Sequence, residues 1–358
     1  MALNFVASFA EIANHNRLIT DLKEAIKNKL FYEEADAFFR IQPGIKGGQQ
    51  VVALDSLEYV TKKETGCGQA ADSFAIDGVA QVWEPQLAKV NIKMCYSEFM
   101  DAFTRWGLAN GYDIHKLDES NFFQFIQDLV VDAMKSDFIR LALFGDGDIA
   151  AQSILGDANK AAYYDVLKKG LIPTLQYFKT QPELAGQFVA LSANAGADRD
   201  TQMALAADYA LNLYELLTDE TYFDADMILS SYSLYKNYKN YLRRGAGNIP
   251  LESSKQQVQD GMDSLKFDGE QLVYSKFYDK KRKEDFTKDN GGGSDVTHLP
   301  HFALYTKKDN LVIGVDDVNA LTDLRLEYIG GSDEHFYIKG NYQVDFKIPN
   351  PKQLRAAL

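Results

Sequence analysis

The chain has 358 residues, of which 46% are hydrophobic, and a formal net charge of −13 at neutral pH. This composition excludes a disordered chain and suffices for two sizeable cores, or for one extended domain with subdomains. The negative charge excludes a general nucleic-acid binder, because such proteins neutralise phosphates with a basic face. Two cysteines, Cys67 and Cys95, do not make a disulfide framework, and no run approaches the ~18 apolar residues of a membrane span. The sequence therefore predicts a soluble, folded, intracellular protein without a signal peptide.

The first predicted element is an amphipathic helix over Asn16–Phe31. Apolar residues recur there every four positions, with charged residues between them, so one face of the helix is apolar. A helix of this length is not stable alone. It must dock on its own chain, which is the usual case, or on a neighbouring subunit. The candidate inter-subunit contacts on its apolar face are Leu18, Leu22 and Ile26.

Residues Ile41–Met94 have the pattern of two long extended arms around a polar tip. Gln49–Val60 and Gly78–Trp83 favour strands, and apolar residues alternate with polar ones from Ala88 to Met94. A protruding hairpin buries little of its own surface, so it needs a partner, either its own domain or a neighbouring subunit. The tip, Thr61–Gly68, is charged and contains glycine. Its candidate inter-subunit contacts are Lys62, Lys63 and Glu64.

A long helix over Asp118–Phe144 is the central prediction, and a shorter helix over Ser97–Gly111 precedes it. Apolar residues in the long helix recur at three- and four-residue spacing, which is the period of one buried face. At 1.5 Å per residue, about 25 residues span roughly 37 Å. Gly145 and Gly147 end the helix, since glycine takes the left-handed backbone angles of a helix terminus. The predicted core of this spine helix comprises Phe122, Phe125, Ile126, Leu129 and Met134.

The rest of the chain predicts a mixed region of helices and strands. Helices are expected over Asp157–Gly170, Arg199–Leu217 and Ser233–Arg244. Asp268-Gly269 and Lys307–Asn310 indicate hairpin turns. Strands are expected over Met227–Ser230, Phe302–Thr306, Leu311–Val315, Leu324–Tyr328, Phe336–Lys339 and Tyr342–Ile348.

One basic segment interrupts this region. Lys280–Asp295 consists almost entirely of charged residues and glycine, so we expect a mobile exposed loop. Its charges are offset locally by Glu284 and Asp285. Neutralising Lys280–Lys283 is therefore expected to leave stability nearly unchanged.

Candidate catalytic and metal-binding residues are few. His298 and His301, with Asp295, could ligate a metal ion, but no third His or Cys is near them in sequence. Residues 146–148 resemble the start of a calcium loop without its third ligand and turn glycine. No phosphate-binding loop, nucleophile elbow or CxxC motif is present, and Cys95 fits a buried packing residue. We therefore expect no enzyme activity and no cofactor, with a soluble metal-dependent enzyme as the remote alternative.

The order of elements is a helical arm, a long β-hairpin, a long helix and a mixed α/β region. In this order the chain resembles the major capsid proteins of tailed bacteriophages, which have the Hong Kong 97-type shell fold. The segments that carry the resemblance echo capsid proteins of phages that infect gut bacteria. They are VNIKMCYSEFMDAF, DFIRLALFGDGD, MILSSYSLYKNYKNYLRR, QDGMDSLKFDGEQLVYS, HFALYTKKDNLVIGVDD and FYIKGNYQVDFKIPNP.

The resemblance implies an α+β fold with an N-terminal arm at 1–40, an extended loop at 41–94, a peripheral domain at 95–156 and 335–358, and an axial domain at 157–334. It implies a structural protein that self-assembles into hexamers and pentamers of an icosahedral head around double-stranded DNA. Expected partners are further copies of the chain, a portal protein at one vertex, and separate scaffolding or decoration proteins. The protein would be made in the host bacterial cytoplasm and reside in the virion, with no membrane involved. An encapsulin-type compartment that holds protein cargo is the alternative with the same fold.

Overall fold

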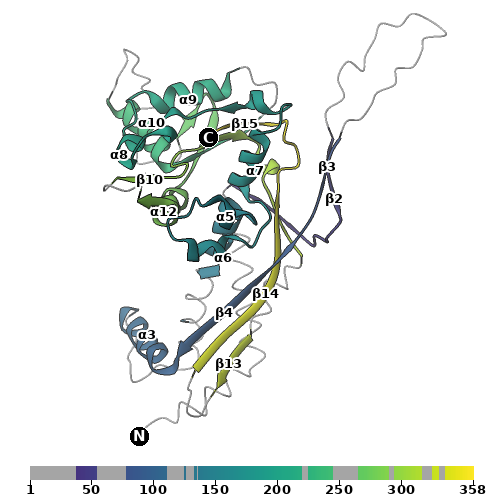
Figure 1. The fold of residues 1–358 in the computed structure, drawn as a ribbon, viewed down its shortest axis with the longest axis vertical. Coiled ribbons are helices and arrows are strands. Elements are labelled where there is room, and N and C mark those ends of the chain that lie inside the picture. Colours follow the sequence, from purple (N-terminus) through teal and green to yellow (C-terminus); the bar gives the residue numbers. More distant parts are fainter. Residues whose placement is uncertain are drawn as a thin grey trace, which may run out of the picture.

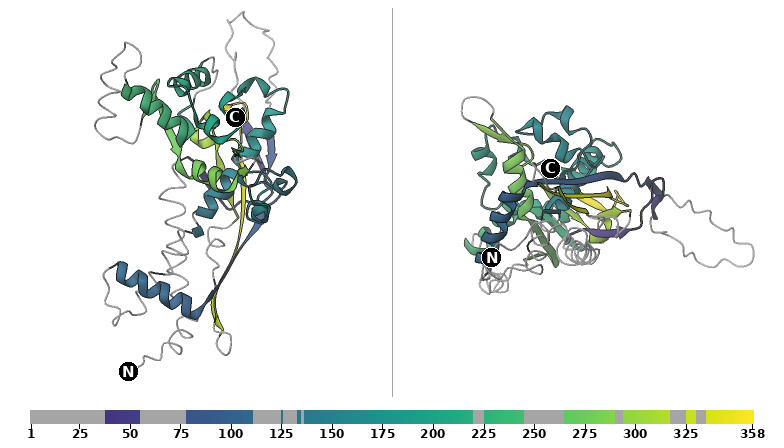
Figure 2. Two further views of the ribbon diagram at one scale, coloured as in Figure 1. Left: turned by 60° about the vertical axis from the view of Figure 1, so that its left-hand side comes forward. Right: turned by 90° about the horizontal axis from the view of Figure 1, so that it is seen from below.

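The computed structural model describes residues 38–54, 78–110, 125, 133–134, 136–219, 225–244, 265–289, 294–316, 325–329 and 335–358. The molecule is elongated (Figure 1). A body of helices and sheet lies at one end, a long pair of strands runs away from it, and a narrow two-stranded ribbon projects on the other side (Figure 2). No helix within these ranges is long and apolar enough to cross a bilayer.

The body is built around a six-stranded sheet with the order β5-β15-β11-β6-β8-β7. β6 pairs in parallel with β8, and β5 with β15, while the remaining pairs are antiparallel. Every residue of β6 and β11 is buried, including Ser230, Ser231 and Thr306, so neither strand alternates between buried and exposed positions. The strands are β5 Phe188–Val189, β15 Leu354–Ala357, β11 Ala303–Thr306, β6 Met227–Ser231, β8 Glu270–Ser275 and β7 Lys266–Phe267.

Helices cover both faces of this sheet. Leu229 and Leu304 point into a large cluster with α7, α12 and the helical residues 136–144. Their neighbours Ile228 and Ala303 point the other way, into a second cluster with α9 and α10. Alternate strand residues thus fill two cores. The helices are α7 Leu171–Lys179, α12 Lys276–Asp285, α9 Tyr209–Thr218 and α10 Tyr232–Arg244.

A second sheet links the body to the long strand pair. Its order is β1-β12-β14-β13, and β4 pairs with the other edge of β14. β4 and β14 are antiparallel, from the pair Gln86 and Val344 to the pair Cys95 and His335. Ala88 is buried while Leu87 and Lys89 are exposed, so the predicted half-buried strand is confirmed. The strands are β1 Arg40–Pro43, β12 Val312–Val315, β14 His335–Lys347, β13 Arg325–Ile329 and β4 Gln86–Cys95.

The ribbon consists of β2, Gln50–Leu54, paired antiparallel with β3, Gly78–Val82. The two predicted arms therefore exist and pair. The sequence interpretation was wrong about β4, which we placed in the second arm of the hairpin, because β4 pairs with β14 near the chain terminus. A partner that is distant in sequence leaves no local pattern, since alternation shows only that one face is buried.

The helix α3, Tyr96–Ala109, follows β4 directly and confirms the predicted shorter helix. Of the predicted spine, residues 125, 133–134 and 136–144 are helical, and the remaining positions lie outside the described residues. Gly145 ends the helix. A Cβ at this position would lie 2.6 Å from the Leu141 carbonyl oxygen, so a larger residue does not fit there.

Two predicted helices are shorter than expected. Arg199–Leu217 divides into α8, Arg199–Met203, and α9, because the buried Gln202 side chain is held by the backbone of Asn194 and Thr297. These tertiary contacts override the helix propensity of the alanine-rich segment that follows. Within the predicted helix Asp157–Gly170, only short turns are helical. They and the other short helices are α5 Ile149–Gln152, η3 Ala158–Lys160, α6 Ala161–Tyr164, η4 Ala185–Gln187 and η5 Ser192–Ala195.

The predicted hairpin turn at Lys307–Asn310 is wrong, because β11 and β12 belong to different sheets. The segment is a short helix, η6 Lys308–Asn310, and the buried Asn310 side chain donates to the Asn350 carbonyl at 2.8 Å. The turn at Asp268-Gly269 is confirmed, with φ of 50° and 93°.

The mobile loop predicted for Lys280–Asp295 is also wrong. Its first part belongs to α12, and β9 Thr287–Asp289 pairs with β10 Asp295–Thr297. Arg282 and Asp285 are buried. The charged residues that indicated solvent exposure in the sequence therefore include two that hold the body together.

Candidate assembly interface

The β2–β3 ribbon projects away from the body as a pair of strands (Figures 1 and 2). Two strands without a covering layer are marginally stable in water. Among the described residues, each strand of the ribbon pairs only with the other, so both outer edges offer unpaired backbone groups. This geometry suits a surface that packs against a second molecule.

The root of the ribbon is anchored by one small apolar cluster. Trp83 and Ile45 are fully buried and pack with Val312 of β12, and Val51 of β2 packs against them. Gly314 makes room for the indole, because a Cβ at Gly314 would lie 2.7 Å from both Trp83 Cζ3 and Ile45 Cδ1. The backbone closes the same joint: Trp83 N donates to the Gln49 carbonyl at 2.9 Å.

Polar contacts cross from the ribbon root to the body. Glu84 N donates to Asp345 Oδ2 at 2.8 Å, and Gln81 Nε2 donates to the Ile348 carbonyl at 2.6 Å. The Glu84 carboxylate pairs with Lys168 Nζ at 2.7 Å on the surface. Asp345 is fully buried, and burial raises its pKa although Lys347 Nζ lies 3.3 Å away and lowers it.

A groove of about 600 Å³ opens beside this joint. One wall comes from the ribbon root, with Gln81, Val82 and Glu84, and the other from α7 and the end of β14, with Tyr177 and Phe346. Val82 is 41% exposed. The outer side of the joint is therefore not filled by side chains of the described chain.

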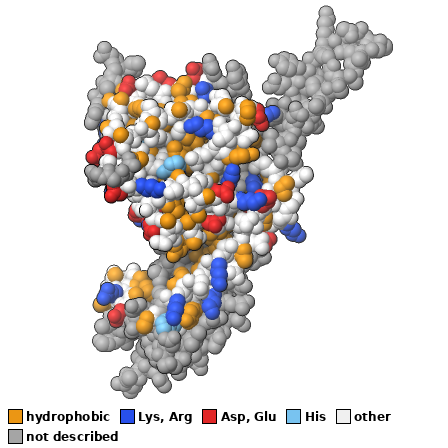
Figure 3. All heavy atoms as spheres, viewed as in Figure 1, with side chains coloured by type: hydrophobic (Ala, Val, Ile, Leu, Met, Phe, Trp, Pro, Cys, Tyr) orange, Lys and Arg blue, Asp and Glu red, His pale blue; other side chains and the backbone are white. Residues whose placement is uncertain are grey.

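The β4–β14 strand pair has one covered and one open face. Val90 and Ile92 pack against the main core, while Lys89 and Lys93 on the opposite face are exposed. Lys93 and Lys339 both approach the Tyr337 ring, at 5.8 and 5.1 Å from its centroid. Basic side chains lie over this strand pair in Figure 3. A chain with a net charge of −13 thus carries a basic strip on an open sheet face.

All the candidate inter-subunit contacts named from the sequence, and most of the candidate core residues of the spine helix, lie outside the described part of the chain. These are Leu18, Leu22 and Ile26 of the arm, Lys62, Lys63 and Glu64 of the tip, and Phe122, Ile126 and Leu129 of the spine. Phe125 and Met134 are described and buried in the main core. The Phe125 ring lies 5.5 Å from the Phe103 ring of α3, so α3 packs on this helical residue.

The histidines considered as metal ligands have other surroundings. His301 is fully buried, with Nε2 2.8 Å from the Gln202 carbonyl and Nδ1 2.7 Å from Ser233 Oγ, so both ring nitrogens are engaged. Burial, with a smaller effect from Arg282 and Lys288, lowers the pKa of His298 to about 4. Across the described ranges, no group of three or more His, Cys, Asp or Glu side chains could hold a metal ion.

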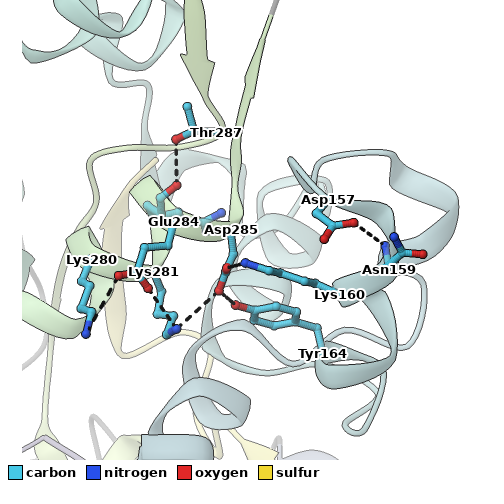
Figure 4. Close-up of polar contacts among 10 residues, drawn as sticks. Asp157, Asn159, Lys160, Tyr164, Lys280, Lys281, Glu284, Asp285 and Thr287 are labelled. Atoms are coloured by element: carbon cyan, nitrogen blue, oxygen red, sulfur yellow. Dashed lines mark hydrogen bonds and ion pairs between the residues drawn. The ribbon is translucent and has the colours of Figure 1, made fainter.

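Asp285, which we assigned to an exposed loop, lies at the centre of a polar cluster in the body (Figure 4). Lys160 Nζ and Tyr164 Oη each lie 2.5 Å from its carboxylate, and Lys281 Nζ lies 3.6 Å away. Burial acts to raise the pKa of Asp285, but the hydrogen bonds from Lys160 and Tyr164 outweigh it and hold the pKa low. The cluster connects α12 to α6. No local sequence pattern indicates this contact.

No family model matches the chain, and no curated protein matches it. Solved structures do. The chain is similar to a chain of the satellite phage P4 procapsid, with 14% identity, a TM-score of 0.47, and coverage of 95% of this chain and 97% of that chain. It is similar to the capsid of cyanophage P-SCSP1u, with 11% identity, a TM-score of 0.38, and coverage of 89% and 86%.

Both of these structures are phage shells. An encapsulin complex from Synechococcus elongatus is also similar, with 10% identity, a TM-score of 0.43, and coverage of 89% of this chain and 84% of that chain. The α+β class is confirmed by the helices and sheets themselves. The narrower resemblance to phages of gut bacteria stays a prediction.

Proposed function

We propose that the chain is the major capsid protein of a tailed bacteriophage, with the role of a structural subunit rather than an enzyme. Copies assemble into hexamers and pentamers of an icosahedral head that encloses double-stranded DNA. The observation that carries this proposal is the β2–β3 ribbon, a two-stranded projection with open edges and a firmly anchored root.

The ribbon has a physical reason to seek a second subunit. Its strands have unpaired edges and no covering layer among the described residues, so packing on another copy would remove apolar and backbone groups from water. The basic open face of the β4–β14 strand pair supplies a second contact. Lys89 and Lys93 would meet an acidic surface of a neighbour, since the chain as a whole is acidic.

We propose a division of the subunit into four parts, and the pairing of the strands supports it. We propose an N-terminal arm at 1–40, an extended loop at 41–85, a peripheral domain at 86–156 with the β14 segment, and an axial domain at 157–334. The strand β4, first predicted to be part of an extended loop at 41–94, joins the peripheral domain because it pairs with β14. The resemblance described above places the whole segment 335–358, and with it residues 354–358, in the peripheral domain. β15 instead pairs with β11 in the six-stranded sheet, so we move these terminal residues to the axial domain.

The partners of such a subunit are mainly other copies of itself. A portal protein at one vertex and separate scaffolding or decoration proteins complete the assembly, which is made in the host bacterial cytoplasm and ends in the virion. The packaged DNA is enclosed without sequence-specific contacts. A net charge of −13 supports this, because an acidic lining repels phosphate and lets the genome slide during packaging.

Deletion of residues 60–70 tests the proposal. The deletion removes the predicted tip and leaves both described strands of the ribbon intact. We expect a folded monomer that forms no shells, whereas the intact chain forms particles that elute at the void volume. Shells of normal size from the deletion variant would contradict the proposed inter-subunit contacts of the tip, Lys62, Lys63 and Glu64.

The contents of particles from infected cells distinguish a phage capsid from an encapsulin-type compartment. Double-stranded DNA and a distinct portal-bearing vertex support a phage head. A protein cargo without DNA would identify an encapsulin-type compartment instead.

A further inference from the structure

We propose that Asp345 is a positioning residue that fixes the direction in which the β2–β3 ribbon leaves the body. The proposal rests on the proposed function in that the ribbon reaches a neighbouring subunit. A shell closes only if each subunit directs its contacts at defined angles. The residue that sets the angle of the ribbon therefore sets the geometry of the assembly.

The position of Asp345 makes this possible. It lies on β14, opposite Gly314 of β12, at the point where β3 ends and β4 begins. Its Oδ2 accepts a hydrogen bond from Glu84 N, and its Oδ1 accepts one from Phe346 N, both at 2.8 Å. Residues 83–85 connect the ribbon to β4, so the Asp345 carboxylate holds the connecting segment at its centre.

The carboxylate is suited to this task because it is buried. Hydrogen bonds to a charged acceptor are stronger than those between neutral groups, and more so away from water. Lys347 Nζ, 3.3 Å from Oδ2, balances the charge. If the buried carboxylate lost Glu84 N, Oδ2 would keep Lys347 Nζ but lose the shorter of its two contacts, so rotation of the ribbon root is opposed by the loss of a charge-assisted hydrogen bond.

Gln81 Nε2 also donates to the Ile348 carbonyl across the joint at 2.6 Å, but the contacts on the outer side of the joint restrain it less. The pair of Glu84 and Lys168 is exposed, at 44% and 60% of the side-chain area, and exposed ion pairs contribute little. The groove of about 600 Å³ lies on the outer side, so apolar packing does not oppose movement in that direction. Trp83 anchors one side of the joint and Asp345 the other.

Hydrogen exchange of the unassembled chain, measured by mass spectrometry, tests the proposal. In Asp345→Ala, we expect exchange in residues 78–86 to accelerate about tenfold or more, because a charged buried hydrogen bond is lost. Asp345→Asn should be intermediate, since the amide has one carbonyl oxygen for two N–H donors. Lys168→Gln is the matched control at the same joint and should exchange as the parent chain does.

Residues 225–231 and 303–306 of the central strands serve as the internal reference for folding. Faster exchange limited to 78–86 supports the proposal. Unchanged exchange at 78–86 in Asp345→Ala would overturn it, as would equal acceleration in the central strands, which would make Asp345 a general stability residue. If exchange accelerates locally but the parent chain never forms shells, the positioning role stands and the proposed function fails.

Where shells form, assembly gives the second measurement. We expect Asp345→Ala to give particles of mixed size or open sheets, and Lys168→Gln to give the parent particles. Particles of parent size and yield from Asp345→Ala would show that the ribbon direction is fixed elsewhere.

Discussion

The guanidinium carbon of Arg282 lies 4.4 Å from the centre of the Phe286 ring. The rings of Phe144 and Tyr278 lie nearly as close, at 4.8 and 5.1 Å. Arg282 is 2% exposed, and within the described residues its Nε and Nη1 have no hydrogen-bond partner. A desolvated cation is therefore stabilised chiefly by aromatic faces at the contact between α12 and the helical residues 136–144.

Replacing this cation is expected to destabilise the body. Arg282→Gln should lower the free energy of unfolding by about 2–4 kcal/mol, because the cation–π contacts are lost and a polar amide is buried among aromatic rings. Chemical denaturation of the unassembled chain measures the change. This replaces the expectation that neutralising Lys280–Lys283 leaves stability unchanged, which assumed an exposed loop.

The neighbouring lysine is the control. Lys280 is 67% exposed and lies 4.0 Å from Glu284, so Lys280→Gln should change stability by less than about 0.5 kcal/mol. Equal effects of the two substitutions would show that the aromatic rings do not stabilise Arg282.

Gly314→Ala is expected to loosen the ribbon root. The added Cβ would meet Trp83 and Ile45 at 2.7 Å, so the indole must move, at a cost of about 1–3 kcal/mol. Trp83 is buried, and its fluorescence should shift to longer wavelength as water reaches the ring. An unchanged spectrum with unchanged stability would mean that the cluster tolerates the methyl group. Gly186→Ala is the control, since a Cβ there meets nothing within 4 Å.

His298 is expected to make the protein less stable in mild acid. Burial, and then Arg282 and Lys288, lower its pKa to about 4, so the folded chain stays neutral there while the unfolded chain takes up a proton near 6.5. Stability from this residue is complete above pH 6.5 and is lost as the pH falls toward 4, by roughly 1–3 kcal/mol.

The difference between His298→Gln and the parent chain isolates this effect. Asp279 and Asp345 have raised pKa values, so they act in the opposite direction and stabilise the folded chain as the pH falls. Both acids are present in the parent chain and in the variant, so their contributions cancel in the difference between the two stabilities. The variant should lose less stability than the parent between pH 7 and pH 4, and parallel curves would contradict the prediction.

The elements with a local pattern could be predicted from the sequence. The alternation from Ala88 to Lys93 gave a half-buried strand, and Asp268-Gly269 gave a turn with positive φ at both residues. Strand pairing could not be predicted, because the partner of β4 lies more than two hundred residues away in sequence. The same limit explains the wrong prediction of a hairpin turn at Lys307–Asn310, because this segment connects two sheets and not two paired strands.

The candidate interface was predictable only in outline. Arms around a polar tip indicated a projection, but Trp83, Gly314 and Asp345 meet through tertiary contacts. The prediction that Arg282 is exposed was wrong for a physical reason. Charged residues are rarely buried without a partner, so a run of four basic residues reads as exposed, and aromatic rings distant in sequence give no sign of enclosing one of them.

Negative-stain electron microscopy of the purified intact chain tests the proposed shell function most directly. If two-stranded ribbons with open edges join neighbouring copies at a fixed angle, we expect closed particles of uniform diameter. Separate monomers at every protein and salt concentration, from a chain that is folded by circular dichroism, would contradict it.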